Sequence, residues 1–317
     1  GQALYYTTTG QYNTGIGYDA LQDNTTGSNN TAIGYQALDV STTADNNTAV
    51  GSATLGSNTT GANNSALGFG ALGQNTTGER NTAIGSLSTD GNTTGNYNTA
   101  MGVNALTSAT DGERNSAFGS AALENLTTGQ YNTSLGQGSS YQMQGGSYNV
   151  AVGHNALYNI YNTDNNTAVG YRAGQSSTSG TNNTSLGENA QPSNSNNSNE
   201  VTLGNSSISA LRCNQTSISS LSDARDKTEV VDLPVGLDFL DKVRPVKFKW
   251  QRREPDINDG KIRAGFIAQE LQEVQKDSDY LDLVMDGNPD KLEAKQGNLI
   301  PVMVQAIKEL SAKVKEL

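Results

Sequence analysis

The sequence of 317 residues is poor in the side chains on which much protein chemistry depends: it has one cysteine, one histidine and one tryptophan. Cys213 has no partner for an internal disulfide, so nothing in the chain relies on an oxidising compartment. Because Cys213 and His154 stand alone, we expect no metal site and no cofactor. No apolar run approaches the roughly 18 residues of a membrane span, so we expect no membrane insertion.

Lysine is absent from residues 1–221, which carry four arginines and 12 acidic residues. Residues 222–317 carry 16 basic and 19 acidic residues, so the net charge of −11 belongs mainly to the first part. An acidic surface rich in Asn, Thr and Gly repels phosphate backbones, which argues against a nucleic-acid partner. The change in composition near residue 221 predicts two domains of different kinds.

A repeat with a period of 17 residues covers residues 1–204. Each unit has a small residue, a large apolar residue and a glycine; eleven of the twelve units have an asparagine before these residues, and most have a leucine four positions after the glycine. Gly, Asn and Thr disfavour a helix, and the two apolar patches per unit predict a coil of two brief strands. The recurring glycines are Gly17, Gly34, Gly51, Gly68, Gly85, Gly102, Gly119, Gly136, Gly153, Gly170, Gly187 and Gly204.

Stacked coils of this kind pair edge to edge, and the repeated asparagines are expected to form ladders along the stack. Residues 1–4 already fit the repeat, so we expect further coils before residue 1. The chain has few large apolar positions for the length that must be ordered. We therefore expect it to associate with other chains and bury a further apolar face.

The segment NTAIGYQAL (residues 30–38) and its counterparts resemble the head repeats of trimeric autotransporter adhesins. The resemblance implies a parallel β-roll, left-handed in that family, and a homotrimer. Tyrosines recur beside the glycine or the asparagine, where they either stack on sugars or pack along the coil. They are Tyr12, Tyr18, Tyr35, Tyr97, Tyr131, Tyr148 and Tyr171.

Residues 207–222 alternate apolar and polar side chains, so we expect a β neck over residues 205–221. Residues 222–317 predict a small α+β domain. We expect a helix in 234–243, a strand in 246–250, an extended then helical segment in 263–271 and a hairpin in 281–294. The last helix has Asn298 as its expected cap and Pro301 in its first turn.

That helix has an apolar seam with the 3, 4 spacing of a short trimeric coiled coil, and packing on its own domain is the alternative. The seam consists of Ile300, Met303, Ile307, Leu310, Val314 and Leu317.

The junction of the two parts, SDARDK (residues 222–227), brings a hydroxyl and an amine into one short segment. Such a pair suggests a peptide bond built to be cut, whereas the plainer interpretation is a polar turn with Ser222 as a cap. Five residues along a strand or a helix hold the two side chains apart. Either the backbone turns sharply at Asp223–Ala224, or Lys227 serves a neighbouring chain.

SDARDK, LDFLDKVRPVKFKW (237–250) and AGFIAQELQEV (264–274) are similar to the endosialidase-type intramolecular chaperone domain that ends bacteriophage tail spikes and fibres. The resemblance implies a domain that aligns three chains and then cuts itself off between Leu221 and Ser222. Ser222 would be the nucleophile and Lys227 the base. Burial, and Arg225 as a nearby cation, would favour the neutral amine that a base requires.

We therefore expect a tail-fibre segment of a virion: a homotrimer that is assembled in the cytoplasm of a host bacterium and binds a cell-surface glycan or an outer-membrane receptor. A bacterial trimeric surface adhesin ranks second, because no membrane anchor follows the repeats and an adhesin ending in a membrane barrel would not need the chaperone. The non-catalytic end of a glycan depolymerase is the third interpretation. Residues 1–204 show no carboxylate pair at a fixed, non-repeating place that would support hydrolysis there.

Overall fold

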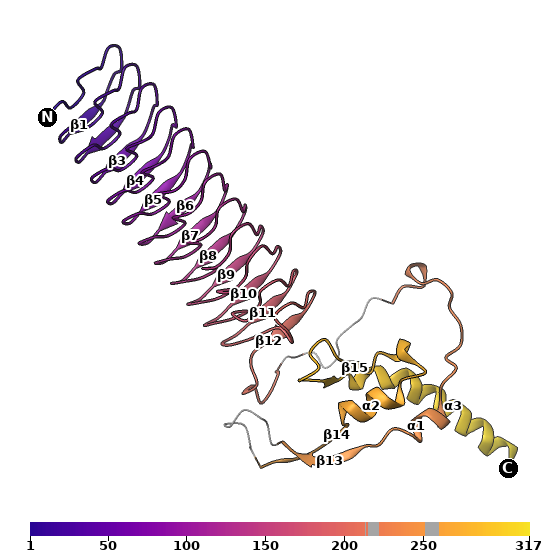
Figure 1. Cartoon of the computed structure of the whole chain (residues 1–317). Helices are drawn as coiled ribbons and strands as arrows, with labels where there is room; N and C mark the ends of the chain where they lie inside the picture. The colour runs from indigo at the N-terminus through magenta and orange to yellow at the C-terminus, as the bar shows by residue number, and fades with distance from the viewer. Residues whose placement is uncertain (213, 215–221, 251–259) are drawn as a thin grey trace. The chain divides into compact units, whose positions relative to one another are not determined.

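The computed structural model describes residues 1–212, 214, 222–250 and 260–317. The chain divides into two compact units, Gly1–Asn205 and Ser206–Leu317. The first unit is a stack of coils and the second is a small α+β unit (Figure 1).

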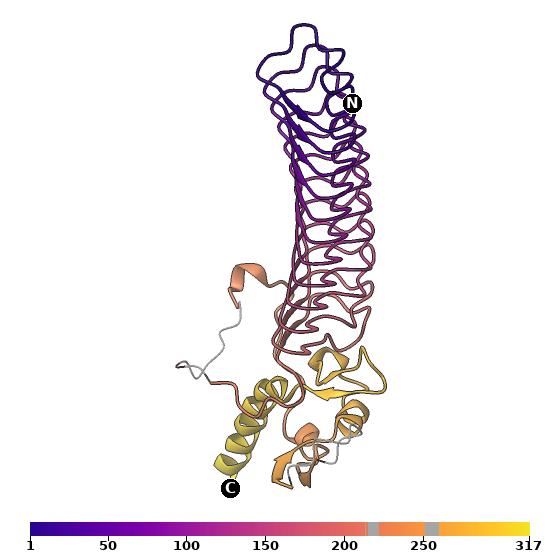
Figure 2. The same ribbon diagram turned by 90° about the vertical axis from the view of Figure 1, so that its left-hand side faces the viewer.

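Twelve three-residue strands, one from each coil, form a single parallel sheet in chain order. The register advances by one repeat per strand, so that Thr14 pairs with Thr31 and Ile16 with Ile33. The 17-residue period therefore sets the stack, as predicted, and Figure 2 shows the strands along one side of it. The strands are β1 (Thr14–Ile16), β2 (Thr31–Ile33), β3 (Thr48–Val50), β4 (Ser65–Leu67), β5 (Thr82–Ile84), β6 (Thr99–Met101), β7 (Ser116–Phe118), β8 (Thr133–Leu135), β9 (Val150–Val152), β10 (Thr167–Val169), β11 (Thr184–Leu186) and β12 (Val201–Leu203).

The prediction of two strands per coil is wrong, because the second apolar patch forms a series of turns. Leu21 and Leu38, four residues after their glycines, have φ values of 53° and 52° and are fully buried. The left-handed conformation costs a non-glycine residue about 1–2 kcal/mol. Burial of a leucine side chain contributes about 1.5–3 kcal/mol and offsets that cost.

The interior of the coils is lined by small residues and leucines. Ala32, in the middle of its strand, is fully buried, whereas Ile33 beside it is 38% exposed. The large apolar residue before each glycine therefore points away from the core. These twelve residues, here called the strand stripe, are Ile16, Ile33, Val50, Leu67, Ile84, Met101, Phe118, Leu135, Val152, Val169, Leu186 and Leu203.

The predicted asparagine ladder is present. The backbone N–H of Asn47 donates to Oδ1 of Asn30 at 2.9 Å, and Nδ2 of Asn47 donates to the carbonyl of Gly61 at 2.9 Å. The same contacts recur from coil to coil, so buried amides satisfy the turns of their neighbours.

The recurring glycines are required by both conformation and space. Gly34 has a φ of 145°, and a Cβ on it would lie 2.3 Å from the carbonyl oxygen of Gly51 in the next coil. No side chain fits such an approach, which explains the glycine at this place in each coil.

The second unit contains three helices, two short antiparallel sheets and three 3₁₀ turns within its described residues. These are η1 (Ala224–Asp226), α1 (Leu237–Leu240), β13 (Val246–Lys249), β14 (Ile262–Gly265), α2 (Ala268–Val274), η2 (Asp279–Leu281), β15 (Val284–Met285), β16 (Glu293–Ala294), η3 (Gln296–Leu299) and α3 (Ile300–Glu316). Strand β13 pairs with β14, and β15 pairs with β16 as the predicted hairpin. The core is formed by Phe239, Leu271, Leu281, Leu283, Val284, Leu299 and Val302.

Three expectations for this region need correction. Residues 205–212 contain no strand, and the rest of the β neck falls largely on 213 and 215–221, outside the described residues. Helix α1 is shorter than predicted, because it starts only after Gly236. Asn298 does not cap α3: turn η3 runs directly into the helix, and Nδ2 of Asn298 donates to the carbonyls of Leu281 and Asp282.

Candidate functional site

The segment that carries the predicted nucleophile and base folds into one tight turn. Asp223 precedes η1 and its side chain accepts a hydrogen bond from the backbone N–H of Arg225 at 2.9 Å. The turn closes when the N–H of Lys227 donates to the carbonyl of Ala224 at 3.3 Å. Aspartate is a favoured residue at such a start, because its carboxylate satisfies a free N–H.

This turn brings Lys227 back to Ser222. Nζ of Lys227 donates to Oγ of Ser222 at 2.6 Å within the same chain. The sequence left two geometries possible, and the structure shows the sharp turn. The contact therefore does not need a lysine from a neighbouring chain. If the amine loses its proton, the same contact lets the hydroxyl donate to the nitrogen.

Arg225 lies in the turn but is engaged elsewhere. Its guanidinium donates to both carboxylate oxygens of Asp223, at 3.0 and 2.6 Å. The hydrogen bonds from Arg225 lower the pKa of Asp223, and the same pairing raises the pKa of Arg225. Among the described residues no hydrogen bond or ion pair joins Arg225 to Lys227, so the cation predicted to act on Lys227 instead holds the capping carboxylate.

The Ser–Lys segment is open to solvent in the single chain. All of residues 222–232 are exposed. Leu221, on the other side of the predicted scissile bond, lies outside the described residues. The structure therefore gives the geometry of the predicted pair, Ser222 and Lys227.

The last helix carries two different faces. Val302 and Ala306 are buried within their own unit, and Oε2 of Glu309 accepts the N–H of Leu237 at the start of α1 at 2.8 Å. The predicted seam lies on another side of the helix and is exposed, with Ile307 at 64% and Leu310 at 50%. Packing of the seam on its own domain is therefore not what the structure shows.

Aromatic side chains stack on one another along the coils. Tyr18 lies on Tyr35 with ring centroids 5.7 Å apart, and Tyr131 lies on Tyr148 at 5.1 Å. Arg114 completes the second column, 5.3 Å from the Tyr131 ring. Most of these rings cover each other's faces, so packing along the coil accounts for them better than stacking on sugars.

The described residues contain no group of three or more metal-ligating side chains. In the same part of the chain, no helix combines the length and apolarity needed to cross a membrane.

The first unit is a β-solenoid and the second is a small α+β unit, and the comparisons add a family for the second. Residues 222–280 match the family described as chaperone of endosialidase, a family of peptidases, so the chain contains this domain and a self-cleaving peptidase activity is indicated. The match begins at Ser222, the residue at the change of composition. Comparison with curated proteins and with solved structures gave no match for the chain.

The sequence predicted Ser222 and Lys227 as the site and the sharp turn as one of two geometries, but it gave no prediction for Asp223. The only sequence signal for that role is an acidic residue directly before a short turn, which is common in loops. It also missed Glu309, whose partner Leu237 is 72 positions away in the chain.

Proposed function

We propose that this chain is a segment of a bacteriophage tail fibre that assembles as a homotrimer and then cuts itself between Leu221 and Ser222. The observation that carries the proposal is the 2.6 Å contact between Lys227 Nζ and Ser222 Oγ, at the first residue of the chaperone match. The β-solenoid that precedes it is the kind of shaft such a chaperone would align.

The proposed reaction transfers the Leu221 acyl group and then releases it. Oγ of Ser222 attacks the carbonyl carbon of Leu221 while its proton passes to the neutral amine of Lys227. The C–N bond then breaks, the nitrogen of Ser222 takes the proton, and an ester remains. Water hydrolyses the ester, which leaves a carboxylate on Leu221 and a new amino terminus on Ser222.

Assembly would switch this chemistry on. A lysine acts as a base only when its amine is neutral, and burial favours that form, whereas both side chains are exposed in the single chain. We propose that neighbouring chains of the trimer cover the turn. The exposed seam of α3 and the strand stripe are the apolar surfaces that association would bury.

The proposed biological role is attachment of a virion to its host. The partner on the bacterium would be a cell-surface glycan or an outer-membrane receptor, and the fibre would assemble in the host cytoplasm. The acidic solenoid, which has no lysine, supports a partner other than nucleic acid.

The test compares the full chain with Ser222→Ala and Lys227→Ala after expression. We expect wild type to yield two fragments that meet at Leu221 and Ser222, and both variants to remain at full length while still forming trimers. Lys242→Ala, an exposed lysine elsewhere in the unit, is the matched control and should be cut like wild type. Mass spectrometry gives the cleavage point and light scattering the assembly. Cleavage at Leu221 in either site variant would contradict the assignment.

A further inference from the structure

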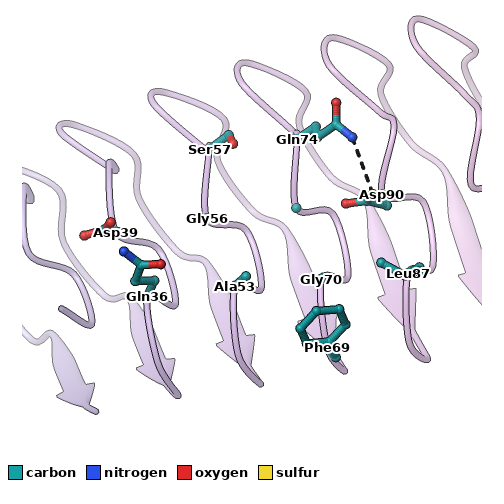
Figure 3. Close-up of a pocket in the computed structure, with 11 residues that line it drawn as sticks. Gln36, Asp39, Ala53, Gly56, Ser57, Phe69, Gly70, Gln74, Leu87 and Asp90 are labelled. Carbon is teal, nitrogen blue, oxygen red and sulfur yellow. Dashed lines mark hydrogen bonds between the residues drawn. The ribbon is translucent and has the colours of Figure 1, made fainter. Parts of the chain in front are cut away.

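A groove interrupts the outer surface of the solenoid between the coils of β2 and β5. Its cavity volume is about 420 Å³, within the roughly 300–1,000 Å³ of small-molecule sites. The groove exists because two consecutive coils have glycine, Gly56 and Gly73, at a place where other coils carry side chains such as Asp39, Asp90 and Tyr158. Figure 3 shows Gly56 in a coil that lies between those of Asp39 and Asp90.

A carboxylate closes each end of the groove. Asp90 is held by a 3.4 Å hydrogen bond from Nε2 of Gln74, and a Cβ on Gly73 would lie 2.5 Å from its Oδ1. Asp39, at the other end, has no hydrogen bond or ion pair from its side chain within the described part of the chain. Burial raises the pKa of both Asp39 and Asp90, so both acids are only partly solvated.

Phe69 stands on the side wall with an open ring face. It is 58% exposed, and the residues one coil before and after it are Ser52 and Ser86. Unlike Tyr18, Tyr35, Tyr131 and Tyr148, it has no ring stacked on it among the described residues. A flat apolar ligand face can therefore lie on Phe69.

We propose that this groove binds a neutral glycan. Sugar hydroxyls would donate to Asp39 and Asp90, the Gln36 and Gln74 amides would supply both donors and acceptors, and the C–H face of a sugar ring would lie on Phe69. Acidic sugars are disfavoured, because the arginines of residues 1–205 lie outside the lining and this part has no lysine to offset the two carboxylates.

The groove is arranged for binding and not for hydrolysis. Asp39 and Asp90 lie three coils apart, about 14 Å at the spacing of paired strands. Glycosidases hold their two carboxyl groups about 5–9.5 Å apart. The proposal deepens the proposed attachment role by naming the ligand class and the place on the solenoid.

The test uses the full chain on a printed panel of neutral hexose and N-acetylhexosamine oligomers, with sialylated and uronate-bearing counterparts. Phe69→Ala removes the open ring. Gly56→Gln fills the groove with a side chain that Gln22 and Gln175 already carry at the same place in their coils. A Cβ on Gly56 would lie 3.3 Å from the carbonyl oxygen of Ala53, a tight contact that a shift of a few tenths of an ångström would relieve. Tyr131→Ala, which removes an exposed ring whose faces are covered, is the matched control.

We expect neutral oligomers to bind wild type and the control alike, and calorimetry with the best of them to show at least a tenfold loss in both groove variants. Absence of neutral binding, preference for acidic glycans, or unchanged affinity in Phe69→Ala and Gly56→Gln would overturn the proposal. Attachment is tested separately with whole bacterial cells: cell binding that the groove variants retain would leave attachment standing and remove the groove from it.

Discussion

At the scale of single residues, one carboxylate organises the turn at residues 222–227. Asp223 caps the turn and holds Arg225, and the turn returns Lys227 to Ser222. None of the four side chains is buried, so local hydrogen bonds alone set this geometry. Asp223 is thus a positioning residue for the proposed self-cleavage.

Replacing Asp223 by alanine removes the cap and should slow self-cleavage about five- to tenfold, since an N-cap contributes about 1 kcal/mol. Asp223→Asn keeps an oxygen that can accept the N–H of Arg225, so it should cut close to the wild-type rate. The measurement is the rate at which fragments appear after synthesis. Equal rates in Asp223→Ala and wild type would show that the cap does not position the pair.

A second buried asparagine ladder, which sequence reasoning missed, has a gap. Nδ2 of Asn75 donates to Oδ1 of Asn58 at 2.7 Å, but Ser41 stands at that place one coil earlier. Asn24 occupies the same place one coil before Ser41, and its Oδ1 is buried without a partner among the described residues. Where asparagine is present a glycine follows three residues later, because a Cβ on Gly61 would lie 2.5 Å from Oδ1 of Asn58. Ser41 is instead followed by Ala44.

The double change Ser41→Asn with Ala44→Gly should therefore close the ladder. We expect it to stabilise the solenoid by about 1 kcal/mol, because it gives the orphaned oxygen a donor. Ser41→Asn alone should destabilise, because Ala44 occupies the space of the new amide. Denaturant midpoints of the full chain measure both effects. If Ser41→Asn alone were as stable as the double variant, residues 41 and 44 would not be coupled.

At the scale of elements, the second unit is held together by contacts between distant segments. Glu309 on α3 accepts the first N–H of α1, and this hydrogen bond from Leu237, followed by one from Gln305, lowers the pKa of Glu309. Because the folded pKa lies below the unfolded one, the contribution is present above about pH 4.3 and is lost as the pH falls through the folded pKa.

Glu309→Ala should thus lower the unfolding midpoint of the second unit more at pH 7 than below the folded pKa, where the protonated carboxyl still accepts the N–H of Leu237 but carries no charge. Glu309→Gln keeps an acceptor oxygen without a charge. The difference in unfolding midpoint between Glu309→Gln and Glu309→Ala should therefore not change with pH. Chemical unfolding at the two pH values is the measurement. A wild-type to alanine gap that is the same at both would exclude the carboxylate as the cause.

The elements differ in how far the sequence could predict them. The strands and α3 follow from local patterns: one small and one large apolar residue before a glycine, and a seam of 3, 4 spacing. The turns around Leu21 could not be predicted, because a leucine with positive φ is stabilised only by burial inside the stack. Asn298 has the composition of a cap, but its amide serves Leu281 and Asp282, whose position depends on the tertiary fold.

At the scale of the whole molecule, both units leave apolar surfaces uncovered. Along the solenoid, Leu67 is 50% and Leu135 48% exposed, and on α3 Ile307 is 64% exposed. The period predicted these outward positions only in part, since it does not tell which apolar patch faces the core. Their exposure in both units supports a partner that runs alongside each, and three parallel copies would supply one.

The candidate site could be predicted from the sequence better than its environment. Ser222 and Lys227 stand out through the change of composition and the resemblance of the motif, and the turn between them is local. In the proposed trimer, other chains would bury the pair, and Leu221 lies outside the described residues. The groove at Phe69 depends on two absent side chains, a signal that becomes clear only once the coils are stacked.

Native mass spectrometry of the freshly expressed full chain, followed by denaturation of the same sample, tests the central claim most directly. We predict an assembly of about 100 kDa, three times the chain mass of 33.3 kDa, which on denaturation gives fragments that meet at Leu221 and Ser222. A stable species of 33.3 kDa that remains a single intact chain would contradict the account.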